Sequence, residues 1–397
     1  MATSVRRKNL AVLGGICVGF IAGIMLHDSG KMLAGIPPSS QSQSHSNHPT
    51  CPSQCLDDPY AKPGMVLWGK DQFGKETRYV PFPSVFSSTS SQQEKLPMRT
   101  KDLDVGGTAY WSNTTEALEL AVPAYTQAIK NKEEETVAFA RNKLALFIGS
   151  SHDRANVETF CLAVGGKSQS WGSHIAAVCH VDWLNLTLAS WFLVGMVDDE
   201  TADWFVSTEK RPITFERRIP EIMLPCMKEA GLEDMKPDLV VFSSLFWDES
   251  FIWRHGMQVG HYSTDPTDGL HGFFYEELKW HRSRVHELIV YLRSMFGEDV
   301  PLMFRTRQHR AKNRWGGVLK IFQLDQSLKS LARETGVRYF SWGSKLEGWL
   351  NFQDEDQHYS FGPTTYLFGD MFLFYLHQAS VPGCWACQLH LDTGSET

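Results

Sequence analysis

The sequence predicts an α/β fold, built on a doubly wound and mostly parallel sheet, behind an N-terminal membrane helix. Two patterns support this: short apolar runs alternate with longer amphipathic ones from residue 144 onward, and an uncharged apolar stretch stands near the amino terminus. The 397 residues, 42% of them hydrophobic, can bury a large core, which excludes a mainly disordered chain. The net charge of −7 argues against nucleic acid as the main partner.

The first predicted element is a transmembrane helix over residues 10–26. Basic residues 6–8 precede this uncharged run of 17 residues, which is just long enough to cross a bilayer. Basic residues before a span keep the amino terminus in the cytosol, so we expect a single-pass type II protein. A cleaved signal peptide is the alternative, although its apolar region is usually shorter. Gly15, Gly19 and Gly23 form one smooth helix face that can pair two spans in a homodimer.

The remaining organisation follows from this anchor. Residues 1–9 become a cytosolic tail, residues 27–62 a flexible stem rich in Pro, Ser, Gln and His, and residues 63–397 a lumenal domain. Asn113 and Asn185 each begin an N-glycosylation sequon. This layout is typical of a membrane-anchored enzyme of the Golgi apparatus or endoplasmic reticulum.

Strands and helices alternate along the lumenal part. The predicted strands are 144–148, 239–242, 301–304 and 337–340, and the predicted helices are 152–164, 272–296, 318–335 and 364–377. Residues 171–237 are predicted to form an insertion or lid between the first two strands. Ligands of such sheets bind beyond the carboxyl ends of the strands, so the residues just after each strand are the first candidates for a site.

The first strand is followed by Gly149, Ser150 and Ser151 and then by a helical pattern. A serine at a strand-to-helix turn can hold its oxygen at the edge of the sheet, near free backbone N–H groups at the start of the helix. This position suits a nucleophile. An ordinary turn followed by a helix cap explains the same residues without any chemistry.

A serine nucleophile needs a histidine base and a carboxylate that orients it. His358 stands directly before the last predicted helix, and Asp354, Glu355 and Asp356 precede it. Each of these acids is a candidate for the orienting carboxylate. A solvated acidic loop with an incidental histidine is the alternative.

These blocks resemble the SGNH/GDSL-type esterases and acyltransferases, especially their fungal and plant polysaccharide-modifying branch of capsule-associated and trichome-birefringence-like proteins. The matching features are residues 149–151, Arg154, the acids before His358, the type II anchor and the C-terminal helix at 368–376. The resemblance spans residues 144–379. It implies an SGNH-like three-layer sandwich, with Ser151 as the nucleophile of an acyl-ester enzyme that needs no metal or cofactor. Its partners would be a carbohydrate acceptor and a small acyl donor.

The chain also departs from the family pattern. Ser150 replaces the acid of the Gly-Asp-Ser block, and Ser243 stands where the family has an asparagine that binds the oxyanion. A hydroxyl can donate one hydrogen bond to an oxyanion but is less preorganised than an amide. For the glycine N–H that the family also uses, Gly166 is our candidate, with Gly165 and Gly172 left open.

Substrate-binding residues are predicted after three of the strands. Arg154 follows the nucleophile block, Trp247 and Asp248 follow Ser243, and Arg305 begins a basic segment after residue 304. Such cations can bind an acidic sugar polymer or an anionic acyl donor, whereas a solvated basic loop is the alternative.

Seven cysteines follow the predicted membrane span. Cys51 and Cys55 can close a small loop, while Cys384 and Cys387 form a C-x-x-C that can hold zinc, act in redox chemistry or join structural disulfides. Structural disulfides from these last two cysteines to Cys161, Cys179 or Cys226 are our preferred interpretation. The leading hypothesis for the whole chain is an O-acyltransferase or esterase, and the competing one is a degenerate domain that binds glycans or scaffolds other enzymes.

Overall fold

The structure is a computed structural model, and it divides the chain into two units, residues 1–48 and 49–397. The residues that it describes all belong to the second unit: 51–67, 77–82, 121–202, 211–234, 236–243, 245–262, 272–308, 318–347, 349–355, 358–359 and 361–387. The predicted membrane span, its glycines and Asn113 lie outside these residues. Within the described ranges, no helix combines the length and the apolar character that a membrane crossing requires.

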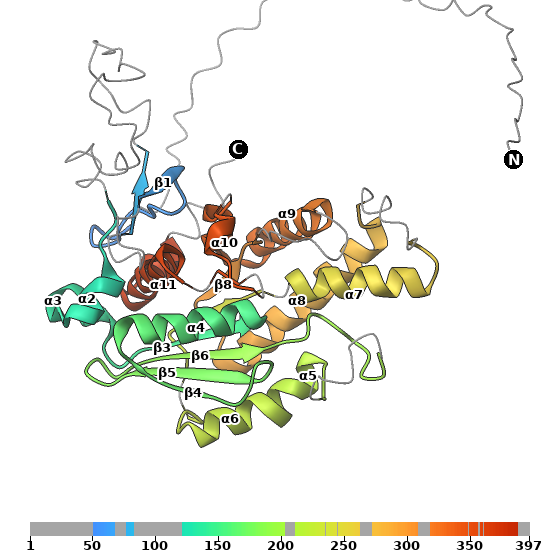
Figure 1. Cartoon of the computed structure of the whole chain (residues 1–397), viewed down its shortest axis with the longest axis horizontal. Helices are drawn as coiled ribbons and strands as arrows, with labels where there is room; N and C mark the ends of the chain where they lie inside the picture. Colours follow the sequence, from blue (N-terminus) through green and yellow to red (C-terminus); the bar gives the residue numbers. More distant parts are fainter. Residues whose placement is uncertain are drawn as a thin grey trace, which may run out of the picture. The chain divides into compact units, whose positions relative to one another are not determined.

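A seven-stranded sheet forms the centre of the folded unit, in the order β4-β5-β6-β3-β7-β8-β9 (Figure 1). Its strands are β3 (Leu144–Gly149), β4 (Lys167–Ser170), β5 (Ala176–Val181), β6 (Leu186–Phe192), β7 (Leu239–Phe242), β8 (Leu302–Arg305) and β9 (Arg338–Phe340). The five strands from β6 to β9 in this order run parallel, while β4 and β5 pair antiparallel at one edge. The sequence therefore predicted the α/β class and the mostly parallel sheet correctly.

Helices cover both faces of this sheet (Figure 1). The longer ones are α4 (Ser151–Val164), α7 (Leu245–Gln258), α8 (Tyr275–Phe296), α9 (Val318–Thr335) and α11 (Pro363–Ser380). The shorter ones are α2 (Tyr125–Asn131), α3 (Glu134–Val137), η1 (Ala138–Ala140), α5 (Phe215–Arg218), the π-helix η2 (Ile219–Met223), α6 (Leu224–Glu229), α10 (Trp342–Lys345) and η4 (Leu350–Phe352).

Strand β3 shows how the two faces form separate cores. All six of its residues are buried, which is typical of a strand covered on both sides. Leu146 and Ile148 point into the core under α6, α7, α8 and α9, whereas Ala145 and Phe147 point into the core under α2, α4 and α11. The result is a three-layer arrangement with two hydrophobic cores.

The predicted insertion at residues 171–237 contributes to this sheet. Its first part forms β5 and β6, and β6 lies between β5 and the nucleophile-bearing strand β3. These two strands were not predicted, and their apolar residues are interrupted by His180 in β5 and by Thr187 and Ser190 in β6.

The segment before the sheet is folded, in contrast to the flexible stem that we predicted up to residue 62. Asp58 forms a buried ion pair with Arg338 of β9, with an Oδ2–Nη2 distance of 2.8 Å, and Tyr60 is 1% exposed. A two-stranded antiparallel hairpin, β1 (Gly64–Leu67) and β2 (Arg78–Pro81), follows.

Three disulfides lie in the described part of the chain. Cys51 pairs with Cys387, Cys55 with Cys384, and Cys161 with Cys179. The small Cys51–Cys55 loop was therefore a wrong prediction, because the two ends of the folded unit are instead tied together. Neither cysteine of the C-x-x-C is available for zinc, because both form structural disulfides as we preferred. The partners that we predicted for them were wrong, since Cys161 and Cys179 pair with each other. Cys226 is buried on α6 and belongs to none of these three bonds.

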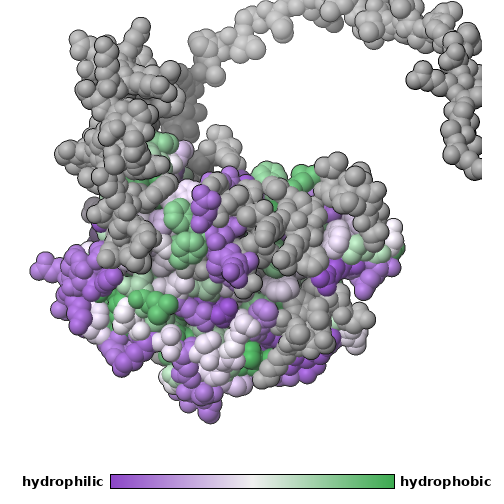
Figure 2. Space-filling view, in the orientation of Figure 1, coloured by the Kyte–Doolittle hydropathy of each residue, from purple (hydrophilic) through white to green (hydrophobic). Residues whose placement is uncertain are grey.

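The surface is mainly polar on the side seen in Figure 2, where hydrophilic side chains dominate the described atoms and apolar ones form small separate patches. On α9, Leu328 and Leu331 are buried. Leu319 and Phe322 are instead 45% and 41% exposed, because the inner face of this helix is turned toward Leu324 and Leu328.

Candidate active site

The turn after β3 places two adjacent serines in different roles. Ser150 is the N-cap of α4, where its hydroxyl accepts a hydrogen bond from the N–H of His152 and its own N–H donates to Asp153 Oδ2 at 2.8 Å. This reciprocal arrangement is a capping box. Ser151 is the first residue of the helix, where backbone N–H groups have no partner within the helix. The cap interpretation therefore holds for Ser150 and leaves Ser151 available for chemistry.

Position 149 requires glycine because neighbouring atoms of Asp153 and Ser243 approach its Cα closely. A Cβ atom at this position would lie 2.3 Å from Asp153 Oδ2 and 2.3 Å from the carbonyl oxygen of Ser243, far inside van der Waals contact. Any larger residue would push the capping carboxylate or the end of β7 away. The glycine thus allows α4 to begin directly against the neighbouring strand end.

Ser151, His358 and Asp354 form a hydrogen-bonded chain. The Ser151 Oγ lies 2.8 Å from His358 Nε2, although 207 positions separate the two residues in sequence. On the other side of the imidazole, Nδ1 lies 3.2 Å from Asp354 Oδ2. Ser151 and His358 are 7% and 8% exposed, so the contact is largely shielded from water. The sequence predicted each of these residue types, and the fold brings them into contact.

The loop before α11 decides which acid contacts the histidine. Gln353 and Tyr359 form an antiparallel bridge, and the Asp354 N–H donates to the carbonyl oxygen of His358 at 3.0 Å. Asp354 Oδ1 also accepts from the His358 N–H at 2.8 Å. Asp354 thus faces His358 across a tight turn, while Glu355 lies at the exposed tip. Asp356 lies outside the described residues.

A second histidine packs against the first. The ring of His152 is 3% exposed and meets the ring of His358 edge-on, with centroids 4.7 Å apart. This contact limits rotation of the His358 ring, so the imidazole is held between His152, Ser151 and Asp354. His152 was not among the predicted site residues, although its position next to Ser151 in the sequence was a signal for such a role.

Arg305, which we predicted to bind substrate, has a partner within the chain. Its guanidinium holds Asp153 through two hydrogen bonds, Nε to Oδ1 at 2.6 Å and Nη2 to Oδ2 at 2.8 Å, and both side chains are at most 5% exposed. The planar guanidinium matches a carboxylate in this paired geometry. Arg305 therefore clamps the first turn of α4, which carries Ser151, to the end of β8.

The other predicted arginine, Arg154, also has a partner within the chain. Its Nη1 lies 2.5 Å from Glu158 Oε2, one turn further along α4. The neighbouring Arg307 is bound to Asp325 and Glu347. Residues 309–317, which complete the basic segment, lie outside the described residues.

Ser243 lies where the resemblance places an oxyanion donor. It follows β7 directly, is 3% exposed, and its N–H donates to Ile148 O at 2.8 Å, which ties it to the end of β3. The Ser243 Oγ is buried and finds no hydrogen-bond partner in the described part of the chain. A buried hydroxyl without a partner is costly unless a ligand or water satisfies it.

Gly166 was a wrong choice for the second donor. It follows the carboxyl end of α4, and a Cβ there would meet the sulfur atoms of Cys161 and Cys179. The 14 residues of α4 separate this end from Ser151 by roughly 20 Å. A glycine that does follow the carboxyl end of a strand next to β3 is Gly195, three residues beyond β6, the parallel neighbour of β3. It has φ +81°, a left-handed value that favours glycine.

The loop around Gly195 is held by a buried aspartate. Asp248 Oδ1 accepts from the Met196 N–H at 2.6 Å, and Asp248 Oδ2 lies 2.8 Å from His281 Nε2, with both side chains fully buried. Asp248 is therefore a support of this loop and not the substrate-binding residue that we predicted. Trp247, also predicted to bind substrate, packs its ring edge-on against Phe192 and His174, with centroids 5.8 and 6.0 Å apart.

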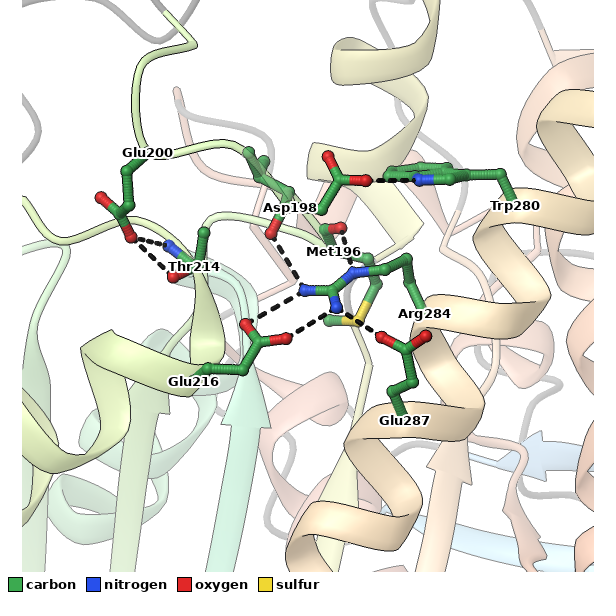
Figure 3. A network of polar contacts seen from close by, with 9 residues as sticks. Met196, Asp198, Glu200, Thr214, Glu216, Trp280, Arg284 and Glu287 are labelled. Carbon is green, nitrogen blue, oxygen red and sulfur yellow. Dashed lines mark hydrogen bonds and ion pairs between the residues drawn. The ribbon is translucent and has the colours of Figure 1, made fainter.

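A second polar network fixes the continuation of the same loop (Figure 3). Arg284 of α8 donates to the carbonyl oxygens of Met196 and Val197, both at 3.2 Å, and to Glu216 Oε1 at 2.6 Å. Nearby, Trp280 donates to Asp198 at 2.8 Å, and Glu200 accepts from the Thr214 N–H at 2.8 Å. Asp198 and Glu200 thus have partners within the chain. Nor does the described part of the chain contain any group of three His, Cys, Asp or Glu placed to hold a metal ion.

Asn185, the described sequon residue, lies in the turn between β5 and β6. It is exposed, and its amide nitrogen donates to Asn142 Oδ1 at 3.0 Å.

Comparison with known proteins gives little further information. No protein-family model matches the sequence, and none of the curated proteins does. Among solved structures, a chain described as a "putative GDSL-like lipase" from Parabacteroides merdae aligns with 59% of this chain and 97% of its own length, at 10% identity and a TM-score of 0.32. Values this low do not establish a shared family.

Proposed function

We propose that this protein is a lumenal carbohydrate O-acyltransferase or esterase that uses Ser151 as its nucleophile. The observation that supports the proposal is the chain of contacts from Ser151 Oγ through the His358 ring to Asp354. A hydroxyl, an imidazole and a carboxylate in this order form the arrangement that activates serine in acyl transfer.

In the first half-reaction, the Ser151 oxygen attacks the carbonyl carbon of the acyl donor. His358 Nε2 takes the hydroxyl proton, and Asp354 stabilises the resulting imidazolium through Nδ1–H. The tetrahedral intermediate then collapses, the bond from carbon to the leaving group breaks, and the leaving group takes the proton from His358. The product is an acyl ester on Ser151.

In the second half-reaction, His358 removes a proton from the acceptor hydroxyl, whose oxygen attacks the acyl carbon. The bond to Ser151 breaks, and the serine oxygen recovers its proton from His358. A sugar hydroxyl as acceptor makes the enzyme a transferase, and water makes it an esterase.

The developing oxyanion needs hydrogen-bond donors near the end of β3. Three groups lie at this edge: the backbone N–H of Ser151 at the start of α4, the buried hydroxyl of Ser243, and the backbone N–H of Gly195. We assign the Ser243 hydroxyl and the Gly195 N–H as the donors from the neighbouring strands. Arg305 acts as a positioning residue, because it holds Asp153 and thereby the turn that carries Ser151.

The lumenal address of the enzyme is part of the proposal. Basic residues 6–8 before the apolar run at 10–26 support a type II anchor, and the sequons at Asn113 and Asn185 fit a Golgi or endoplasmic reticulum lumen. An epitope tag after Thr397 should be protected in cells permeabilised only at the plasma membrane. Accessibility of that tag would contradict the orientation.

The catalytic proposal is tested by labelling the purified full-length protein with a fluorophosphonate probe, which reacts covalently with activated serines. We expect labelling of the unmodified protein and at least about 100-fold slower labelling of the Ser151→Ala and His358→Ala variants. The matched control is Ser150→Ala, which removes the adjacent serine and a helix cap worth about 1 kcal/mol but leaves the nucleophile.

Equal labelling of Ser151→Ala and the unmodified protein would overturn Ser151 as nucleophile. Absence of labelling in a folded, unmodified protein would favour the competing hypothesis, a glycan-binding domain without catalysis.

A further inference from the structure

A second pocket opens between the β1–β2 hairpin and the segment after β9. Its volume is about 420 Å³, within the range of small-molecule sites. Nine residues line it: Pro63, Gly64, Met65, Val66, Tyr79, Phe82, Ser344, Lys345 and Trp349. None of them belongs to the site around Ser151.

Lys345 is the cation of this pocket, and it pairs with no carboxylate among the residues that the structure describes. Its ammonium group donates to the hydroxyl of Tyr79 at 2.8 Å and lies 4.4 Å from the centroid of the same ring. The Tyr79 hydroxyl in turn donates to the carbonyl oxygen of Lys62 at 2.8 Å, which fixes its orientation. An ammonium group has three N–H donors, so Lys345 can offer two to a ligand.

The contacts of Lys345 differ from those of Arg305 and Arg307, which form ion pairs within the chain. Arg305 is bound to Asp153, and Arg307 to Asp325 and Glu347, so neither has a guanidinium free for an anion. Lys345 is instead partly buried, and its ammonium group contacts the neutral side chain of Tyr79. Burial lowers the pKa of Lys345 to about 8, while the charge of nearby Asp58 acts in the opposite direction. The amine is therefore mostly protonated at neutral pH.

The rest of the pocket is apolar and partly aromatic. Trp349, Phe82 and Met65 line its wall. The side chains of Phe82 and Met65 are 53% and 47% exposed. Trp349 packs against Phe352, with ring centroids 5.5 Å apart, which supports the indole from behind. One cation among flat apolar surfaces suits a ligand with one negative charge on a ring-shaped body.

The pocket lies on the ligand side of the sheet. Ser344 and Lys345 follow β9, and their segment is tied to the end of β8 because the Ser344 N–H donates to the Thr306 hydroxyl at 3.3 Å. Strand β9 is the third strand from β3 in the sheet order, which places the ends of these strands roughly 14 Å apart. Two or three linked sugar rings can span such a distance.

We propose that this pocket binds a carboxylate carried on a six-membered ring, with the charge at Lys345 and the ring face against Trp349. Two sources share this chemistry, a uronic acid of a glycan and an aryl carboxylate. The binding of a carboxylate in this pocket does not depend on the proposed function. The further step, that the carboxylate belongs to the acceptor glycan, rests on the proposed function.

The test is isothermal titration of the full-length protein in detergent with methyl glucuronide, methyl glucoside and benzoate. We expect saturable binding of the glucuronide and at least 10-fold weaker binding of the neutral glucoside. Benzoate binding as tightly as the glucuronide would assign the pocket to aryl carboxylates. Equal affinity for the glucoside and the glucuronide, or no binding of either carboxylate, would overturn the proposal.

Variants separate the role of the charge from a loss of folding. Lys345→Met should weaken glucuronide binding at least 10-fold, whereas Lys345→Arg should retain most of the affinity. Trp349→Ala should weaken the binding of both glucuronide and benzoate. The matched control is Lys130→Met, which removes an exposed lysine of α2 that is not in the pocket. Unchanged binding in a folded Lys345→Met protein would refute the assignment.

The Ser151→Ala variant distinguishes the two proposals. It should bind methyl glucuronide with unchanged affinity, because Ser151 is not part of the pocket. We therefore expect the Ser151→Ala variant to lose fluorophosphonate labelling and to keep glucuronide binding. If instead the unmodified protein bound glucuronide but was never labelled, the pocket would stand and the catalytic proposal would fail.

Discussion

Arg305 holds Asp153 with two parallel hydrogen bonds of 2.6 and 2.8 Å, and this buried pair joins the end of β8 to the first turn of α4. The same Asp153 carboxylate caps the N–H of Ser150. Three strand ends, those of β3, β7 and β8, thus meet around one ion pair next to the proposed nucleophile. Because both side chains are nearly inaccessible to water, the pair cannot be weakened by salt in the way that a surface pair can.

Removing one partner of this pair should destabilise the fold strongly. We expect Arg305→Met to lower the free energy of unfolding by about 3–5 kcal/mol, because it leaves the Asp153 charge buried and uncompensated. Chemical denaturation followed by circular dichroism measures the loss. The double variant Asp153→Leu, Arg305→Met should be less unstable than the sum of the single variants. Strict additivity would mean that the two groups are not coupled.

Asp354, and not Glu355, should be the acid that assists His358. Asp354→Ala is expected to reduce the rate of fluorophosphonate labelling by at least about 100-fold, because the imidazole loses the partner that orients it and stabilises its charge. Glu355→Ala should change the rate less than about 3-fold, since this side chain is exposed at the tip of the loop. A larger effect of Glu355→Ala would reverse the assignment.

The buried hydroxyl of Ser243 should act on the transition state. Ser243→Ala is expected to slow turnover of an acyl ester by about 100-fold to 1,000-fold, with a small change in KM, because an oxyanion donor is lost. Ser243→Asn should preserve or raise the rate, since an amide donates from a similar place. Equal rates for all three proteins would remove Ser243 from the oxyanion site.

Asp370 should make stability depend on pH. It lies on α11 and accepts from the Thr126 N–H at 2.8 Å, and its burial raises the pKa of the carboxyl group from 3.8 to about 7. The folded protein then holds a proton that the unfolded chain releases, so the free energy of unfolding should fall as pH rises from about 4 to about 7. A shift of about three units corresponds to at most about 4 kcal/mol.

The variant that isolates this effect is Asp370→Asn, which cannot ionise but can still accept from Thr126. Its midpoint of thermal unfolding should fall less between pH 4 and pH 7 than that of the unmodified protein. Glu135→Gln, at an exposed position of α3, serves as the control and should leave the pH profile unchanged. Parallel profiles for Asp370→Asn and the unmodified protein would show that Asp370 does not titrate in this range.

The sequence by itself determined several local elements of this protein, although not β5 and β6. The four predicted strands overlap β3, β7, β8 and β9, and the helix predicted at 318–335 coincides with α9. Burial on two faces produces continuous apolar runs, and burial on one face of a helix produces a period of 3.6, so both signals are contained in short windows of sequence. The same local logic identified Ser151 at a strand-to-helix turn.

Tertiary structure decided which of these residues are partners. Three acids precede His358, and only the bridge between Gln353 and Tyr359 turns Asp354 toward the ring. Arg305 was predicted to meet a ligand but meets Asp153, and Cys55 pairs with Cys384 and not with Cys51. Each of these choices depends on the order of strands in the sheet, which brings together groups that lie far apart in the chain. A hydrogen bond or a disulfide acts only over a few ångströms, so the fold had to select the partner before chemistry could use it.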